Sequence, residues 1–246
     1  MDRALYVAMT GATQTMRAQA VNNNNIANAS TLGFRAEIAA LQSDAVNGPG
    51  QPTRVNAVAV ETGWDSSSGA LVQTGNPLDV AMRDNSWLGV QAPDGTEAYT
   101  RAGDLRVNAL GQLQTGAGHL VLGDGGPISI PPNSSVNIGA DGTLSIVPLG
   151  QDPATMASVG RLKVVDADPS QLQRGVDGLM RAVPGATLNP SSGNAVSSGV
   201  LESSNVNLPQ TMVNMIGLAR QFELQVKMMK TIEDNATAAQ SVMRMS

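Results

Sequence analysis

Residues 209–243 read PQTMVNMIGLARQFELQVKMMKTIEDNATAAQSVM and carry the longest regular pattern in the sequence. Apolar and small residues recur at alternating steps of three and four, which is the heptad period of a helix with one apolar face. Pro209 suits a first helical turn, and Asn207 is placed to cap it. A helix of about 35 residues is about 50 Å long and needs a partner for its seam. The predicted seam consists of Met215, Leu218, Phe222, Gln225, Met229, Ile232, Ala236, Ala239 and Met243.

The amino terminus supplies a candidate partner. A second seam steps by four and three through Leu5, Met9, Ala12, Met16, Gln19, Asn23 and Ile26. Small residues nearby would let two helices approach closely: Ala4, Ala8, Gly11, Ala12, Ala18 and Ala20. Two seamed helices at opposite ends of the chain predict a coiled coil, within one molecule or between copies. The alternative is an ordinary helical hairpin that completes the core of a monomer.

Four consecutive asparagines, residues 22–25, end the amino-terminal pattern. Asparagine side chains compete with the helix backbone for hydrogen bonds, so such a run ordinarily marks a helix end. The alternative is that these amides form hydrogen bonds at a packed interface. Gly33 then provides a turn, and Phe34 is a single large side chain among small ones.

The middle of the chain has a different character. Many of the 26 glycines lie between residues 63 and 150, and Asp94-Gly95, Asp124-Gly125 and Asp141-Gly142 are hairpin-type turn signals. Short apolar runs between the turns predict strands near residues 78–82, 87–90, 105–107, 120–122, 128–130, 136–138, 144–147 and 161–165, and a further strand is expected over 55–60.

The expected class is therefore α+β, with long coiled-coil-like terminal helices flanking an inserted, irregular all-β domain. We predict a helical segment over residues 1–34, an extended connector over 35–75 and a β-rich domain over 76–183. A second connector follows over 184–204, and the carboxy-terminal helix covers 205–246.

Composition narrows the classes of function. The net charge of −5 gives no electrostatic case for nucleic acid. The absence of cysteine excludes disulfides and thiolate sites. We find neither a run of about 18 apolar residues nor a signal-peptide pattern, so we expect no membrane insertion and no ordinary cleaved export route.

Catalytic chemistry is hard to assemble from these residues. His119 is the single histidine, and no nucleophile pattern surrounds it. The glycine-rich residues 123–127 lack the lysine and the helix of a phosphate loop. We therefore predict no catalytic residue, no cofactor, no metal and no small-molecule substrate. Two alternatives stay open: a glycan-active enzyme of wall remodelling, which would need a carboxylate pair in a cleft, and a secreted β-rich binding module.

Three ordered motifs resemble the flagellar rod and hook proteins. The first is Asn25-Ile26-Ala27-Asn28 with Thr31, Gly33, Phe34 and Arg35; the last is residues 201–207 (LESSNVN) with Met212, Met215-Ile216, residues 220–223 (RQFE) and Lys227. Between them lie residues 77–81 (PLDVA), Tyr99-Thr100-Arg101, Gly103 and residues 125–128 (GGPI). Within the family, Trp87-Leu88, residues 159–163 (VGRLK) and the first six residues are most similar to the proximal rod branch.

This resemblance implies a structural subunit of the flagellar basal body, in the rod that crosses the periplasm. It implies export through the flagellar type III apparatus and assembly into the axial tube through terminal segments that become helical as subunits stack. The implied partners are other rod subunits, proximal and distal, and further copies of the chain itself. The implied assembly residues are Asn25, Ile26, Ala27, Asn28, Thr31, Gly33 and Phe34; Met215, Leu218, Phe222, Met229 and Ile232; and Glu202, Ser204, Asn205 and Val206.

Overall fold

The computed structural model describes residues 2–45, 55–83, 85–152 and 155–244, and they form two compact units. Unit 1 is drawn from residues 2–29, 36–65 and 206–244, and unit 2 from Ser30–Arg35 and Ser66–Asn205. Two long helices flank a many-stranded region in the sequence, so the predicted α+β class is confirmed.

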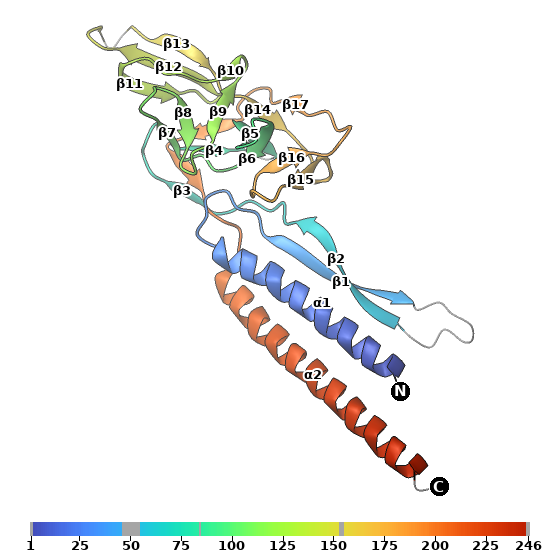
Figure 1. The fold of residues 1–246 in the computed structure, drawn as a ribbon. Helices are drawn as coiled ribbons and strands as arrows, with labels where there is room; N and C mark the ends of the chain where they lie inside the picture. The colour runs from blue at the N-terminus through green and yellow to red at the C-terminus, as the bar shows by residue number, and fades with distance from the viewer. Residues whose placement is uncertain (1, 46–54, 84, 153–154, 245–246) are drawn as a thin grey trace. The chain divides into compact units, whose positions relative to one another are not determined.

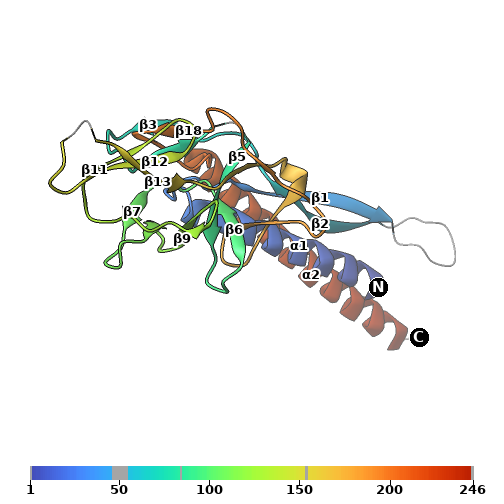
Figure 2. The ribbon, with the colours of Figure 1, turned by 90° about the horizontal axis from the view of Figure 1, so that it is seen from above.

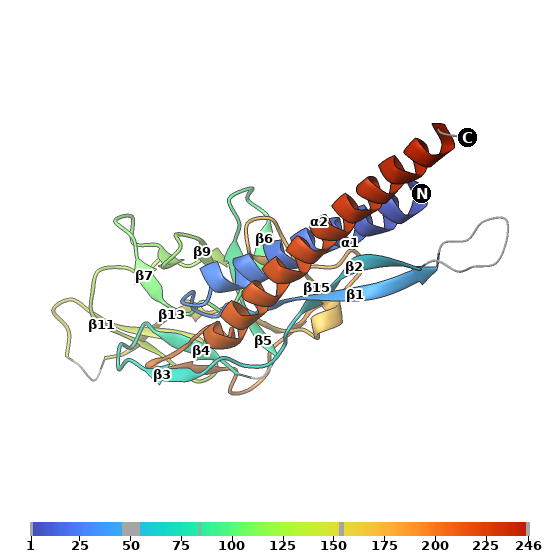
Figure 3. The same cartoon turned by 90° about the horizontal axis from the view of Figure 1, so that it is seen from below.

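Unit 1 contains the two helices, α1 (Asp2–Ala27) and α2 (Leu208–Arg244), which lie side by side in three views of the molecule (Figures 1, 2 and 3). They run antiparallel, because Asn22 near the end of α1 contacts Thr211 near the start of α2, and Gly11 faces Gln225. These pairs place the start of α1 opposite about residue 233 of α2, so α2 continues for about three further turns. Neither described helix is long and apolar enough to cross a membrane.

The predicted seam of α2 faces α1. Met215, Leu218, Phe222, Met229 and Ile232 are all half-buried, whereas the residues between them on the helix are mostly exposed. Asn207 caps the helix as expected, with its Oδ1 accepting the backbone N–H of Gln210 at 3.1 Å. This face of α2 therefore agrees with the predicted coiled coil in its form within one molecule. The side chain of Met243 lies outside the residues whose side chains are described.

The predicted seam of α1 is wrong by about one position. Leu5, Met9 and Met16 are exposed, and Asn23 is exposed as well. Ala12 of the predicted seam is buried, and the other buried residues of this helix are Ala8, Gln14, Thr15, Asn22 and Asn25. Small side chains face inward because the helices approach closely: a Cβ built on Gly11 would lie 3.1 Å from the side chain of Gln225. The large apolar side chains, which defined the predicted seam, are turned outward.

A two-stranded ribbon completes unit 1. Strands β1 (Glu37–Ala45) and β2 (Val55–Trp64) pair antiparallel, with Glu37 opposite Trp64 and a bulge between Ile38 and Ala39. Both strands contact α1 (Figure 1). The strand expected over residues 55–60 is thus part of β2.

Unit 2 is a set of short antiparallel strands. Its ten-stranded sheet has the main order β15-β16-β6-β5-β9-β8-β7, with β10 paired to β9 and with β14 joining β5 to β17. The strands of this sheet are β5 (Ser86–Gln91), β6 (Glu97–Thr100), β7 (Leu105–Val107), β8 (Leu113–Thr115), β9 (Leu120–Gly123), β10 (Gly126–Pro127), β14 (Val164–Asp166), β15 (Leu172–Arg174), β16 (Met180–Ala182) and β17 (Asn189–Pro190).

Smaller sheets surround it. β11 (Asn133–Ile138), β12 (Thr143–Pro148) and β13 (Ala157–Arg161) form a meander, β4 (Val80–Met82) pairs with β18 (Val196–Ser198), and β3 (Leu71–Gln73) pairs with β19 (Val200–Glu202). A short 3-10 helix, η1, covers Pro169–Gln171. The pairs β4–β18 and β3–β19 join the start of this unit to its end, so it closes on itself.

Aliphatic side chains fill the core of unit 2. Leu88, Val90, Leu113, Val121 and Leu144 are each fully buried, as the scarcity of aromatic residues requires. The expected turn at Asp94-Gly95 links β5 to β6, and the one at Asp141-Gly142 links β11 to β12. The strand predicted over residues 128–130 is wrong: β10 ends at Pro127, and Ile128 and Ile130 are buried core residues outside any strand.

Candidate functional site

The amide run at the end of α1 forms specific hydrogen bonds within unit 1. The Asn25 side chain donates from Nδ2 to the carbonyl oxygen of Glu37 at 2.9 Å and accepts the Glu37 backbone N–H at 2.8 Å. A single buried amide thus pairs with the first residue of β1 as another strand would. Asn22, also buried, donates to the carbonyl oxygen of Thr211 at 2.9 Å. Of the two readings of this run, the structure supports hydrogen bonding at a packed interface for Asn22 and Asn25.

The rest of the amino-terminal motif is less enclosed. Ile26 is half-buried and Ala27 exposed, and Asn28 bonds back to the carbonyl oxygen of Asn24 at 3.0 Å. Asn23 and Asn24 are exposed. Only the first and fourth asparagines of the run, Asn22 and Asn25, therefore reach the interior, as expected for a helix with one inward face.

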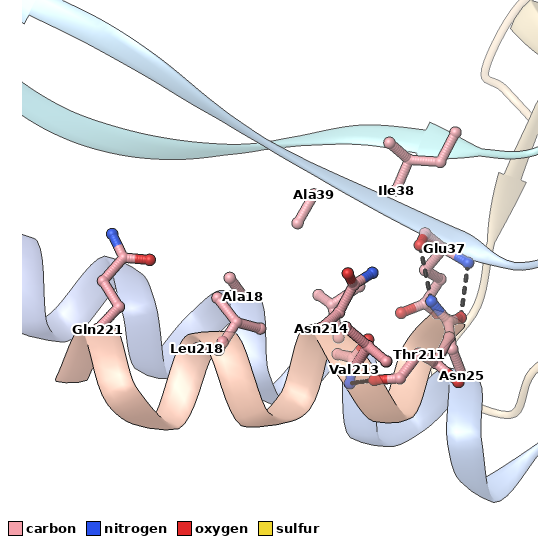
Figure 4. A pocket seen from close by; sticks show the side chains of 13 residues that line it. Ala18, Asn25, Glu37, Ile38, Ala39, Thr211, Val213, Asn214, Leu218 and Gln221 are labelled. Atoms are coloured by element: carbon pink, nitrogen blue, oxygen red, sulfur yellow. Dashed lines mark hydrogen bonds between the residues drawn. The ribbon is translucent and has the colours of Figure 1, made fainter. Parts of the chain in front are cut away.

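A groove of about 670 Å³ lies between α1, β1 and the first turns of α2 (Figure 4). Figure 4 shows Asn25 and Glu37 bonded to each other at one end of it and Gln221 of α2 at the other end, with Asn214 of α2 between them. Its lining comprises Ala18, Val21, Asn22, Asn25, Glu37, Ile38, Ala39, Thr211, Val213, Asn214, Gly217, Leu218 and Gln221. The lining combines small residues with amides and holds one charged residue, Glu37.

Replacing Asn25 by alanine is expected to destabilise unit 1 by about 2–3 kcal/mol, because the backbone N–H and C=O of the half-buried Glu37 each lose a partner. Asn23→Ala is the matched control, since Asn23 is exposed on the same helix and should change stability by less than about 0.5 kcal/mol. Urea unfolding followed by circular dichroism at 222 nm measures both, since the α-helices belong to unit 1. Equal midpoints for the two variants would contradict the assigned role of Asn25.

The amino-terminal and carboxy-terminal motifs meet in unit 2 around one buried carboxylate. Glu202 is 1% exposed, and its Oε1 lies 2.7 Å from Nη2 of Arg35, while its Oε2 lies 2.7 Å from Nε of Arg101. The backbone N–H of Gly69 also donates to Oε1 at 2.9 Å. We call Arg35, Arg101 and Glu202 the Glu202 cluster; both arginines are 2% exposed.

Further bonds hold both arginines in place. Arg101 donates to the carbonyl oxygens of Ser86 at 2.9 Å and Met82 at 2.8 Å. Arg35 donates to the carbonyl oxygen of Ser67. Buried charges are tolerated when they are paired with opposite charges. The Glu202 cluster thus ties residues far apart in the sequence to one point.

Gly33 and Phe34 bring the 30–35 segment to this point. The Gly33 N–H donates to the Glu202 carbonyl oxygen at 2.9 Å, and the Phe34 carbonyl oxygen accepts the Asn205 N–H at 3.3 Å. Gly33 has a φ of +66°, and a Cβ there would lie 2.3 Å from the carbonyl carbon of Arg101. The guanidinium carbon of Arg174 lies 4.5 Å from the centroid of the Phe34 ring, a cation–π contact.

The remaining residues of the carboxy-terminal motif lie beside this cluster or just after it. The Asn205 side chain donates to the carbonyl oxygen of Ser67 at 2.9 Å, and Ser204 is half-buried next to it. Val206 is half-buried at the start of the last stretch of unit 1, and Thr31 is exposed. Of the predicted residues, Gly33, Phe34, Glu202 and Asn205 are therefore brought together.

Sequence reasoning did not identify Arg35, Arg101 and Arg174 as functional residues. Arg35 and Arg101 appear in the motifs, but nothing local distinguishes a buried arginine from an exposed one. The available signal was the low content of charged residues, 14%, which makes each charge inside a motif informative. The pairing itself depends on contacts distant in sequence.

No group of three or more His, Asp or Glu side chains is placed to hold a metal ion in the described part of the chain. His119 precedes β9, and its backbone N–H donates to the Thr115 hydroxyl oxygen at 3.3 Å. Burial and then the hydrogen bond to Glu97 raise the pKa of Tyr99, so its hydroxyl stays protonated in ordinary conditions.

The helices expose large apolar side chains on the sides that do not face each other. On α2, Val213, Leu224 and Ile216 are 63%, 65% and 53% exposed. Leu208, Met212, Val226 and Met228 on the same helix, and Leu5, Tyr6, Met9 and Met16 on α1, are also at least 40% exposed. Many large apolar side chains exposed on one element ordinarily mark a surface that contacts another protein.

The chain is similar in sequence to known proteins along its whole length. The chain matches three family models: "Flagella basal body rod protein" over residues 5–35, "Flagellar hook protein FlgE/F/G D1 domain" over 81–146 and "Flagellar basal body rod FlgEFG protein C-terminal" over 197–242. It is 45% identical to the flagellar basal-body rod proteins FlgF of Escherichia coli and of Salmonella typhimurium, over 252 residues and 100% of both chains. It is 32% identical to the rod protein FlgG of Bacillus subtilis over 95% of this chain and 96% of the relative. Full-length similarity at this level shows that the chain belongs to the flagellar basal-body rod protein family.

Proposed function

We propose that this protein is a structural subunit of the proximal part of the flagellar basal-body rod. Its site of action is the rod where it crosses the periplasm, its partners are other rod subunits and further copies of itself, and it acts without catalysis. Export by the flagellar type III apparatus and assembly through the terminal helices are parts of the same proposal. The full-length similarity to FlgF supports the proximal assignment.

The observation that carries the assembly proposal is the exposed apolar surface of α2. The half-buried face of α2, which includes Phe222, is turned toward α1 within one chain. Val213 and Leu224 are eleven residues apart, about three turns, and so lie on one face, roughly opposite Phe222. Its apolar side chains, which stand beside Arg220 and Lys227, are uncovered in the single chain, which makes this face the surface for neighbouring subunits.

Two sets of predicted residues then have different roles. Met215, Leu218, Phe222, Met229 and Ile232 hold α2 against α1, and we propose that they act on assembly by shaping the helix pair. Asn25 of the amino-terminal motif fixes the end of α1 against β1, and Asn22, just before the motif, fixes it against the start of α2. The exposed faces of the helix pair make the contacts with neighbours.

A charge placed on the exposed face tests the proposal. Leu224→Asp is expected to abolish swimming in a bacterium whose own copy of the gene is deleted, because a charged carboxylate would replace an apolar side chain that neighbouring subunits bury. The isolated variant should keep its helix content, since Leu224 is 65% exposed in the single chain.

Leu110→Asp is the matched control, because Leu110 is 81% exposed on a turn of unit 2, outside the helices. It introduces the same chemical change and should leave the swimming halo at its normal diameter. Normal swimming of the Leu224→Asp strain would overturn assembly through α2. An equal loss of swimming in both strains would show a general effect of added charge. That result would also count against assembly through α2.

A further inference from the structure

The 30–35 segment is held in unit 2 in the way a peptide ligand is held by a receptor. The chain before it, residues 2–29, and the chain after it, residues 36–65, belong to unit 1, whereas the segment itself belongs to unit 2. The remainder of unit 2, Ser66–Asn205, is one continuous stretch that lacks only these six residues. The bonds between the two parts can therefore be described as ligand and site.

The site provides main-chain partners for the segment. The carbonyl oxygen of Glu202 accepts the Gly33 N–H at 2.9 Å, and the Asn205 N–H donates to the carbonyl oxygen of Phe34 at 3.3 Å. Nη2 of Arg174 donates to the carbonyl oxygen of Arg35 at 2.7 Å. Three consecutive residues are thus held through their backbones, as in peptide recognition by an added strand.

The site also selects the residue type at each of the three positions. The carboxylate of Glu202 binds the guanidinium of Arg35, and the pair is almost fully removed from solvent. The guanidinium of Arg174 covers the Phe34 ring, with 4.5 Å from its carbon to the ring centroid. At Gly33 the backbone of Arg101 and Ala102 comes so close that a Cβ would lie 2.3 Å from the carbonyl carbon of Arg101 and 2.6 Å from the nitrogen of Ala102. The preferred sequence is therefore glycine, aromatic, arginine.

Parts of the site are held in place independently of the segment. Glu202 stays paired with Arg101 at 2.7 Å and with the Gly69 N–H at 2.9 Å, and Arg101 is bonded to the carbonyl oxygens of Ser86 and Met82. Glu202 is also the last residue of β19, which pairs with β3. Removal of the segment would leave the recognising carboxylate positioned by these bonds.

We propose that unit 2 carries a recognition site for an extended Gly-aromatic-Arg segment, which residues 30–35 fill within one chain and which the same segment of a second copy fills when the internal one is displaced. The ligand class is defined by a small residue at a left-handed position, an aromatic ring and a guanidinium group. The site is independent of the exposed helix faces, so it does not require the assembly proposed above.

Chemical rescue tests the site. In the full chain carrying Phe34→Ala and Arg35→Ala, the internal segment loses its ring and its cation, and the thermal midpoint of unit 2 should fall. The acetylated and amidated peptide STLGFR, which supplies residues 30–35 and their terminal carbonyl, should then raise that midpoint saturably by about 2–4 °C. The peptide carrying Gly33→Ala should have no effect, because its Cβ would overlap the backbone of Arg101.

The controls separate this outcome from general stabilisation. The peptide should also fail to raise the midpoint of the chain that carries Glu202→Gln in addition, since the site then lacks its carboxylate. If the double variant does not fold, Phe34→Ala alone, which keeps the Arg35–Glu202 pair, is used in the same way. Equal effects of STLGFR and of the peptide with Gly33→Ala, or no effect of either on a folded variant, would overturn the site.

A second measurement tests the second copy as the source of the segment. Both partners carry Leu224→Asp, which removes the apolar contact on α2. One partner also carries Phe34→Ala and Arg35→Ala and keeps the site; the other also carries Glu202→Gln and keeps the segment, while its own site lacks the carboxylate that binds Arg35. Their mixture should form a mixed pair in sedimentation at concentrations where neither forms pairs alone, and STLGFR should dissociate it. Absence of mixed pairs while the peptide still rescues the midpoint would overturn the second-copy source and leave the site itself standing.

Discussion

Replacing Glu202 by glutamine is expected to destabilise unit 2 by about 3–5 kcal/mol, the range for breaking a buried ion pair from one side. Glutamine has nearly the shape of glutamate, so the packing changes little. The change leaves the guanidinium groups of Arg35 and Arg101 buried, each facing an uncharged partner. One oxygen of the carboxylate also becomes an NH₂ group, which can only donate and so confronts another donor.

Tryptophan fluorescence can follow this change in one unit at a time. The chain has two tryptophans, Trp64 in unit 1 and Trp87 in unit 2. In a Trp64→Phe background, Trp87 reports unit 2 alone, and the guanidinium carbon of Arg101 lies 5.6 Å from the centroid of its ring. Urea unfolding of this background with and without Glu202→Gln gives the difference in free energy of unfolding.

Glu97→Gln in the same background is the matched control. Glu97 forms an ion pair with Lys163 at 2.7 Å, but both side chains are more than a third exposed. Solvent screens such a pair, so its loss should cost less than about 1 kcal/mol. If the two glutamine variants unfolded at the same urea concentration, the Glu202 cluster could not be the main tie between the two motifs.

The sequence predicted one helix face correctly and the other incorrectly, for a single reason. On α2 the residues that face α1 include large apolar ones such as Phe222, and large apolar side chains define a heptad seam. On α1 the inward residues are alanines, threonine and asparagines, while Leu5, Met9 and Met16 point outward. A hydrophobic pattern marks the faces that become buried somewhere. It does not distinguish burial within one chain from burial between chains.

The β region shows where local signals are sufficient. Asp-Gly turns at residues 94–95 and 141–142 were predictable because aspartate side chains bond to the backbone two residues on, as Asp94 does to Thr96. The pairing of β3 with β19 was not predictable, because it joins residues about 130 apart in the chain without any local mark. The α+β class therefore followed from the sequence, whereas the strand order did not.

The sequence predicted several residues of the candidate site. It did not predict which of them contact each other. The resemblance to rod proteins pointed to Gly33, Phe34 and Glu202 as parts of motifs at opposite ends of the chain. The structure adds the reason that they occur together: one buried carboxylate binds an arginine from each of two segments. Only 14% of the residues are charged, so a cluster of three buried charges is unusual in this chain. The sequence does not show which charged residues are buried, and so it could not reveal the cluster.

Gly33→Ala is expected to release the 30–35 segment from unit 2 while the rest of the unit stays folded. Two costs combine at this position. A left-handed φ of +66° costs an alanine about 1–2 kcal/mol. In addition, the new Cβ would lie 2.3 Å from the carbonyl carbon of Arg101, which is backbone and cannot rotate away. The segment can avoid this overlap only by giving up the bond from Gly33 to Glu202.

Gly95→Ala separates the two costs. Gly95 has a φ of +81°, and a Cβ there would meet nothing within 4 Å, so this variant shows only the backbone cost of about 1–2 kcal/mol. Native-state hydrogen exchange should show the N–H groups of Gly33 and Asn205 losing protection in Gly33→Ala and keeping it in Gly95→Ala. Protection lost at these groups but kept at Val90 and Val121 in the core would mean that the segment binds and leaves as a separate element. Loss at all four groups would instead show that the 30–35 segment is inseparable from the fold of unit 2, and the ligand-and-site description would be wrong.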